Sequence, residues 1–166
     1  MDQGALVINY TGHGGEQGLA EERLIDIPTV NSWANMENMP LFITATCEFS
    51  RYDDPERFSA GELSILNPNG GMIALLTTVR VVNAGPNKVL NARIWTNNLL
   101  NDINEVPCIG DVFTKCKNTG TSWNDRNFTL LGDPAMKLAY PEYEVLTDSI
   151  NGQEVSVFKD TLGALD

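Results

Sequence analysis

The stretch that decides the fold is Ala5-Leu6-Val7-Ile8-Asn9-Tyr10-Thr11-Gly12-His13-Gly14-Gly15. Its apolar part is typical of a buried strand covered on both faces, which we expect over Gly4–Tyr10. The glycines that follow favour a tight turn. His13, the single histidine of the chain, lies in that turn. The sequence therefore predicts a strand that ends next to an imidazole.

A second apolar run, Leu41-Phe42-Ile43-Thr44-Ala45-Thr46, ends directly on Cys47. We predict a strand here and another over 72–79, with helices over 28–36 and 59–66 between the strands. Further along the chain we expect helices over 87–101 and 109–116 and a strand over 128–131. Strands that alternate with helices predict an α/β fold with a parallel sheet and right-handed crossovers.

The pattern changes after Pro141, where short β segments are expected over 144–146 and 154–158, around Asn151-Gly152. We therefore divide the chain into a main domain over 1–140 and, over 141–166, a linker with the start of a β module. The chain begins in a strand and ends without a clear stop, so we expect it to be an N-terminally truncated fragment of a longer protein.

Composition excludes several classes of protein. The 166 residues carry a formal net charge of −11, from 22 acidic and 11 basic side chains. Nucleic-acid binding needs clustered basic side chains, so no nucleic-acid partner is expected. No apolar run approaches the roughly 20 residues that span a bilayer, and no signal peptide is visible at the start.

The three cysteines, Cys47, Cys108 and Cys116, do not form the even set of a disulfide framework. With one histidine and no C-x-x-C pair, a zinc site of the usual spacing is not expected either. We predict that no cofactor is needed. The acidic run Asp53-Asp54-Pro55-Glu56 is either a solvated loop or a structural calcium site.

His13 and Cys47 carry the chemistry that the sequence predicts. Ligands of a parallel sheet bind at the carboxyl ends of the strands, and both residues come just after such an end. In one cleft they would act as acid–base group and nucleophile, the pair used by cysteine hydrolases. The backbone N–H groups of Gly14 and Cys47 are candidate oxyanion donors. Taken alone, a cysteine at a strand end is usually a buried thiol and a histidine in a glycine-rich turn is often only a turn residue; the pairing of the two at successive strand ends favours the catalytic interpretation.

Two other interpretations use the same glycines. A strand followed by His-Gly-Gly resembles the oxyanion loop of lipase-type hydrolases, but that loop needs a G-x-S-x-G elbow and a separate histidine, and the chain has neither. A phosphate-binding loop would need a following G-K-[ST], which is also missing.

Four segments in this order resemble the gingipain family of caspase-like (clan CD) cysteine peptidases from Bacteroidetes. They are Tyr10–Gly15, the strand ending Ala45-Thr46-Cys47, Asn69-Gly70-Gly71 leading into 72–78, and Leu130-Leu131-Gly132-Asp133-Pro134-Ala135-Met136. Within that family, 46–55 and 76–82 are most similar to PorU-type sortases of the type IX secretion system.

The resemblance implies a caspase-like three-layer α/β/α fold with a mostly parallel sheet, His13 as the catalytic histidine and Cys47 as the nucleophile. It implies that Thr77, Thr78, Val79 and Arg80 help to bind substrate, and that an immunoglobulin-like module follows the peptidase domain. The segment 77–83 contains no acidic side chain, so specificity for Arg or Lys is not indicated. The family's third catalytic carboxylate comes from a part that is missing here; the nearby Glu16 and Glu48 are expected to be solvated loop acids.

The implied activity is cleavage of peptide bonds at the C-terminal sorting region of secreted proteins, at the outer-membrane surface or outside a Bacteroidetes-type cell. Type IX secretion components would be its partners. The alternative is a catalytically inactive scaffold or cargo-docking fragment. An unpaired edge on the strand Gly4–Tyr10 further predicts a homo-oligomer, or a strand borrowed from the C-terminus.

Overall fold

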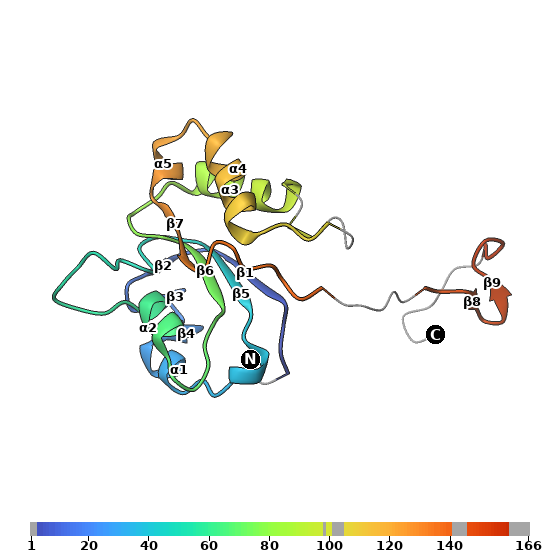
Figure 1. Ribbon diagram of the computed structural model, residues 1–166, viewed down its shortest axis with the longest axis horizontal. Coiled ribbons are helices and arrows are strands. Elements are labelled where there is room, and N and C mark those ends of the chain that lie inside the picture. Colours follow the sequence, from blue (N-terminus) through green and yellow to red (C-terminus); the bar gives the residue numbers. More distant parts are fainter. Residues whose placement is uncertain (1–2, 98, 101–104, 141–145, 160–166) are drawn as a thin grey trace.

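The computed structural model describes residues 3–97, 99–100, 105–140 and 146–159. At its centre is a four-stranded sheet in the order β1-β5-β6-β7. The strands are β1 (Val7–Thr11), β5 (Leu41–Ala45), β6 (Ala74–Thr78) and β7 (Phe128–Gly132). β1, β5 and β6 are parallel, and β7 pairs antiparallel with β6. Figure 1 shows the sheet between two groups of helices.

One face of the sheet is covered by α1 (Ile27–Asn31) and α2 (Ala60–Leu66), and the other by α3 (Ala84–Thr96), α4 (Ile109–Asn118) and α5 (Trp123–Arg126) (Figure 1). Two hydrophobic clusters correspond to these faces. Leu41 and Ile43 of β5 pack with Leu90 and Ile94 of α3, whereas Phe42 packs with Val30 and Ala60 on the opposite face. This alternation along β5 is the period of two expected of a strand buried on both faces.

β7 departs from the parallel arrangement that the alternating pattern predicted. Two main helices, α3 and α4, lie between β6 and β7 along the chain, whereas the crossover between two parallel strands usually contains one helix. α4 begins beside the end of β7, because the N–H of Gly110 donates to the Pro134 carbonyl at 2.9 Å. The chain therefore runs along the sheet twice, once in α3 and once back in α4, and returns to the carboxyl end of β6. There Phe128 pairs with Thr78, and β7 runs antiparallel to β6.

The first strand was predicted as Gly4–Tyr10 and covered on both faces. Its bounds differ, but its side chains do pack on both faces, Val7 in one hydrophobic cluster and Ile8 and Tyr10 in the other. β1 spans Val7–Thr11, and none of its residues is fully buried. Within the described residues it is the edge strand, with β5 on one side only. The expected borrowing of a C-terminal strand does not occur in that part of the chain.

Three short strands, β2 (Gly14–Gly15), β3 (Gly18–Leu19) and β4 (Ile25–Asp26), form a small antiparallel sheet where the sequence predicted only a loop. The helix predicted over 28–36 is replaced by α1 and a 3-10 turn, η1 (Met36–Asn38). The strands β2 to β4 and the turn η1 are too short to give a periodic apolar pattern, so no sequence signal identified them.

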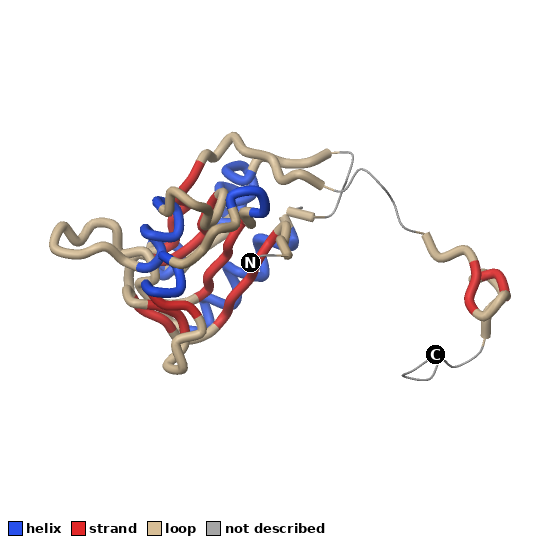
Figure 2. The backbone as a smooth tube through the Cα atoms, turned by 90° about the horizontal axis from the view of Figure 1, so that it is seen from below, coloured by secondary structure: helices blue, strands red, loops and turns tan. Residues whose placement is uncertain are grey.

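Beyond the sheet, β8 (Ser149–Ile150) and β9 (Gln153–Glu154) form a hairpin. Its turn is Asn151-Gly152, both with positive φ, as a two-residue hairpin turn requires. The predicted segment 144–146 lies mostly outside the described residues. Figure 2 shows the same arrangement of helices and strands from below. None of the described helices is long and apolar enough to span a membrane.

Candidate active site

His13 and Cys47 follow neighbouring strands at the same level. β1 and β5 are paired in parallel, with Thr11 opposite Ala45. Each candidate residue comes two positions after that pair. Because adjacent strands lie about 4.8 Å apart, the register places both residues side by side at the carboxyl edge of the sheet.

The pleat of the two strands also places the pair on one face. Side chains alternate along a strand, and Leu41 and Ile43 point to the face that α3 covers. Continuing this alternation puts Cys47 on the same face. On β1 the same alternation assigns Thr11, and after it His13, to the face that α3 covers. A hydrogen bond agrees with this for Thr11, because Asn91 of α3 donates from Nδ2 to the Thr11 hydroxyl at 3.1 Å.

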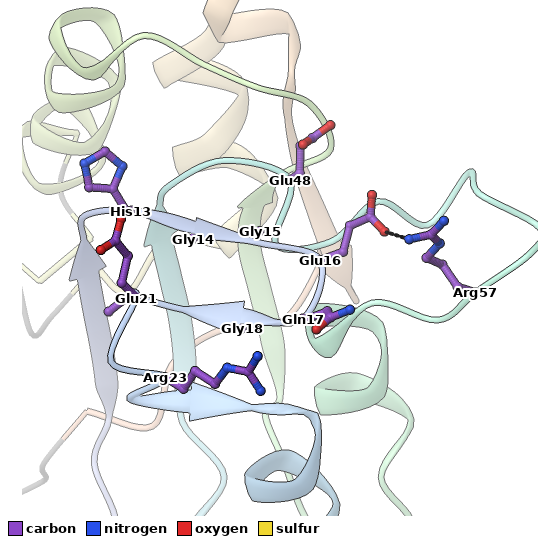
Figure 3. Close-up of a pocket in the computed structure, with 11 residues that line it drawn as sticks. His13, Gly14, Gly15, Glu16, Gln17, Gly18, Glu21, Arg23, Glu48 and Arg57 are labelled. Carbon is purple, nitrogen blue, oxygen red and sulfur yellow. Dashed lines mark ion pairs between the residues drawn. The ribbon is translucent and has the colours of Figure 1, made fainter.

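The backbone of His13 is held firmly, whereas its ring is exposed. The His13 carbonyl accepts two hydrogen bonds, from the Tyr10 hydroxyl at 2.6 Å and from the N–H of Ala20 at 2.8 Å. Among the described residues, the imidazole has no hydrogen-bond partner. Figure 3 shows the ring pointing away from the hairpin formed by β2 and β3. The turn is therefore fixed while the side chain is free to reorient.

The Cys47 thiol is half-buried, and its Sγ atom lies 3.5 Å from the carbonyl oxygen of Val82. Val82 belongs to the segment 79–83, which connects β6 to α3. Directly after the cysteine, Glu48 adopts a left-handed conformation with φ 47°, and its N–H donates to the Arg80 carbonyl at 3.4 Å. The cysteine is thus fixed against the loop that precedes α3, and no hydrogen bond joins it to His13.

The two predicted oxyanion donors are available. Ala20 and His13 share a hydrogen bond, so the adjacent pair, Gly14 and Leu19, falls at a non-hydrogen-bonded position of the antiparallel ladder. The N–H of Gly14 therefore points away from β3. The N–H of Cys47 has no acceptor among the described residues.

Comparison with known proteins shows the family of the chain. A model of peptidase family C25 matches residues 1–139. The chain belongs to peptidase family C25. This confirms the resemblance to gingipains and the predicted class, that of a cysteine peptidase. No curated protein sequence matches the chain.

Three solved structures share the C25 fold with a TM-score of 0.67 and cover 82% of the chain. They are a protease (16% identity), the Arg-specific cysteine proteinase gingipain R (14%), and the complex of pro- and mature domains of RgpB from Porphyromonas gingivalis (14%). The likeness confirms the caspase-like three-layer fold. The chain spans about a third of each of these structures, between 34% and 36%.

A pocket of about 580 Å³ lies beside the hairpin of this C25 chain. His13 and Gly14 form one wall, and Glu16, Glu48 and Arg57 contribute charged groups to it. In Figure 3 the Glu16 and Arg57 side chains approach each other at the far end from His13. Cys47 does not line this pocket, so the pocket extends from the histidine side of the pair.

Glu16 is not the solvated loop acid that the sequence predicted. Its side chain is only 14% exposed, and its two carboxylate oxygens face Arg51 at 2.9 Å and Arg57 at 3.4 Å. Glu48 is also half-buried, with Arg51 at 3.7 Å. These pairs tie the hairpin to the segment after Cys47 and neutralise the carboxylates that line the pocket.

The residues predicted to bind substrate divide into two groups. Thr77 and Thr78 are fully buried, and their hydroxyls are used internally: Thr44 donates to Thr77 at 2.7 Å, and Thr78 donates to the Thr46 carbonyl at 2.6 Å. Their side chains support the wall of the site from within the sheet. Val79 is half-buried, and Arg80 is exposed at the surface.

Arg80 is held by the acidic segment that had been considered for calcium. Its guanidinium binds both carboxylate oxygens of Asp53, with one Nη1–Oδ1 distance of 2.8 Å, and this lowers the pKa of the Asp53 carboxyl. Asp54 faces Arg57 at 3.6 Å. No cluster of three or more metal-binding side chains occurs among the described residues. Asp53 and Asp54 are paired with arginines, and a structural calcium ion at this segment stays a prediction.

Sequence reasoning missed Asn87, whose side chain is buried at the start of α3. The signal was present, because Asn87, Leu90 and Ile94 follow the i, i+3, i+7 spacing of one helix face. A polar residue at a position that the helical repeat assigns to the apolar face is the feature that could have identified Asn87.

Proposed function

We propose that the chain carries the nucleophile and the acid–base group of a cysteine endopeptidase, Cys47 and His13. The observation that supports the proposal is the register of β1 and β5, in which Thr11 lies opposite Ala45, two residues before His13 and Cys47 respectively. A structural role would not require a thiol and an imidazole at equivalent positions of neighbouring strands.

In the proposed mechanism, the Cys47 thiolate attacks the carbonyl carbon of the substrate peptide bond. The C–S bond forms as the carbonyl π electrons move to oxygen, and the N–H groups of Gly14 and Cys47 bind that oxyanion. His13, protonated by the thiol, donates its proton to the departing amine as the C–N bond breaks. A thioester on Cys47 and a free amine result.

The second half-reaction regenerates the enzyme. His13 accepts a proton from water, the hydroxide oxygen attacks the thioester carbon, and the thiolate leaves. An amine in place of water would give transpeptidation with the same two residues. The exposed imidazole supports this role, because it can serve the leaving amine and then the incoming nucleophile.

The substrate class is part of the proposal. We infer that the protein acts on peptide bonds at the C-terminal sorting region of secreted proteins, at the surface of or outside a Bacteroidetes-type cell, together with type IX secretion components. The support is the resemblance of 46–55 and 76–82 to PorU-type sortases. We further propose that 141–166 begins a β module beyond the peptidase domain, and the hairpin β8–β9 is in keeping with it.

Site-specific alkylation tests the catalytic assignment without a known substrate. With iodoacetamide and mass-spectrometric mapping, we expect Cys47 to react faster than Cys108, which is also half-buried and serves as an internal control. His13→Ala should slow the alkylation of Cys47 and leave Cys108 unchanged. Equal rates at the two thiols, insensitive to His13→Ala, would overturn the proposal.

The second candidate function is an inactive scaffold that docks cargo. One observation favours it: the Cys47 thiol bonds to the Val82 carbonyl and not to the imidazole. In that case the thiol is structural: Cys47→Ala in the full chain leaves cargo binding intact, and the wild-type chain does not displace the carboxylate of a peptidyl acyloxymethylketone probe to form a thioether on Cys47. Labelling of the wild-type chain by that probe, lost in Cys47→Ala, excludes the scaffold.

A further inference from the structure

The pocket beside His13 has no part in the proposed mechanism, although it adjoins the acid–base group. It has a volume of about 580 Å³ and is lined by His13 and Gly14, but not by Cys47. His13 donates a proton to the departing amine in that mechanism, so the amine lies on the histidine side of the scissile bond. The pocket therefore lies next to the part of the substrate that leaves, and not next to the part that stays on the sulfur.

The floor of the pocket is bare backbone. Gly14 and Leu19 are opposite each other in the ladder of β2 and β3, so they share one face, and Leu19 is buried on that face in the core. Gly15, the next residue, points to the other face and lines the pocket. A Cβ atom on Gly15 would meet no atom within 4 Å. A side chain at this position would therefore take up space in the pocket without disturbing the hairpin.

Two charged side chains of the pocket are available to a ligand. Besides His13, the charged residues that line it are Glu16, Glu21, Arg23, Glu48 and Arg57. Glu16, Glu48 and Arg57 take part in ion pairs. Glu21 and Arg23, in the turn between β3 and β4, form no ion pair within the part of the chain that the structure describes. The pocket thus retains one uncommitted acid and one uncommitted base.

Glu21 and Arg23 belong to different ends of the pocket. Glu21 lies at the histidine end, because it and His13 together also line a smaller pocket that Arg23 does not reach. In Figure 3 the Arg23 side chain extends along the small sheet, away from the His13 end. The carboxylate of Asp26, which also attracts Arg23, accepts two hydrogen bonds from Thr29 at the start of α1. The Arg23 guanidinium therefore keeps its donors for another group.

We propose that this pocket binds the substrate residues that follow the scissile bond, and that Arg23 receives an acidic side chain of that segment. The inference rests on the proposed function. A guanidinium without an ion pair binds a carboxylate through charge-assisted hydrogen bonds. At the other end, Glu21 attracts the ammonium group that the new amine becomes after cleavage. The open floor at Gly15 accommodates the peptide backbone between these two ends.

Direct binding tests the pocket without catalysis. His13 is the only histidine of the full chain, so selective ¹⁵N labelling of histidine reports a single imidazole by NMR. The probes are the amides of the dipeptides Asp-Ala and Asn-Ala, which share the free amine and differ by one charge. Both should shift the His13 signal. We expect the Asp-Ala amide to bind about fivefold more tightly, because ion pairs with an exposed side chain such as Arg23 are weak.

Two substitutions with matched controls separate charge from space. Arg23→Gln should abolish the preference for the Asp-Ala amide, whereas Arg126→Gln removes the same charge outside the pocket and should keep it. Gly15→Leu should abolish binding of both amides. Gly85→Leu, at a glycine whose added Cβ also meets no atom within 4 Å but which does not line the pocket, should bind them as the wild type does. Arg23→Gln changes an exposed side chain, so it decides the test if Gly15→Leu does not fold.

The outcomes distinguish this inference from the proposed function. A peptidyl acyloxymethylketone that forms a thioether on Cys47 fills the side of the residues before the scissile bond. Binding of the Asp-Ala amide should survive this labelling. If labelling abolishes it, the pocket belongs to that side, and the inference is overturned while the catalytic pair stands. Equal affinities for the two amides in the wild type overturn the role of Arg23. If the probe does not label Cys47, the proposed function fails, and the assignment of the pocket fails with it.

Discussion

A methyl group on Gly14 would lie 2.5 Å from the hydroxyl oxygen of Thr46. The residue after the histidine thus touches the residue before the cysteine. Leu19 Cδ2 at 3.1 Å and the Gly18 carbonyl at 3.2 Å close the other sides. Only a residue without a side chain allows the His13 turn to approach the Cys47 strand this closely.

We therefore expect Gly14→Ala to destabilise the fold by about 1–3 kcal/mol, as overpacking does, and to slow the alkylation of Cys47 because the turn must move. Gly15→Ala is the matched control, since nothing lies within 4 Å of its added methyl group. Thermal unfolding and the alkylation rate measure both effects. Combining Gly14→Ala with Thr46→Ala should restore part of the loss; equal behaviour of the Gly14 and Gly15 variants would contradict the contact.

The Asp53–Arg80 pair gives a prediction for acid pH. Hydrogen bonding to Arg80 lowers the pKa of Asp53, so the pair contributes stability above the ordinary carboxyl pKa and loses it as the pH falls through the lowered value. Asp53→Asn should lower the urea midpoint at pH 6, and its difference from the wild type should shrink as the pH falls toward 2. The effect should be small and salt-sensitive, because both side chains are 44% exposed.

The neighbouring exposed acid Glu56 provides the control for that experiment. Glu56→Gln removes the same charge without breaking the pair, so its urea midpoint should match the wild type at both pH values. If the urea midpoint of Asp53→Asn lay below that of the wild type by the same amount at pH 6 and at pH 2, the Asp53–Arg80 pair would not be the source of the difference.

Packing of α3 on the sheet predicts a large difference between two adjacent positions. Leu90 is fully buried, whereas Val89 is 48% exposed. We expect Leu90→Ala to lower the free energy of unfolding by about 2–5 kcal/mol and Val89→Ala to change it little. Chemical denaturation of the two variants measures this. Similar losses at both positions would mean that α3 is rotated about its axis.

The exposed edge of β1 predicts association of the chain with itself. Its outer side is unpaired within the described residues, and unpaired edges form strand contacts. Light scattering should show a dimer whose population rises with concentration and falls in Asn9→Lys, which adds a charge to the edge strand. Asn31→Lys adds the same charge at the exposed end of α1 and should have no effect. A monomer at every concentration would refute the edge contact.

Much of the site could be predicted from the sequence because it depends on strand ends. The apolar runs before His13 and Cys47 identify β1 and β5 through local periodicity, and a parallel sheet brings such ends to one edge. The hairpin after His13 could not be predicted, since its strands of two residues are held by the tertiary contact of Gly14 with Thr46. The antiparallel β7 likewise depends on where α4 docks.

By itself the sequence determined that a histidine and a cysteine follow two apolar strands, because apolar periodicity and glycine turns are local properties of the chain. Only the tertiary structure decided that Thr11 faces Ala45, that Arg51 and Arg57 neutralise Glu16, and that the Cys47 thiol lies against the Val82 carbonyl. Register, ion pairs and helix docking join residues far apart along the chain. Their energies depend on distance and burial, which the order of residues does not contain.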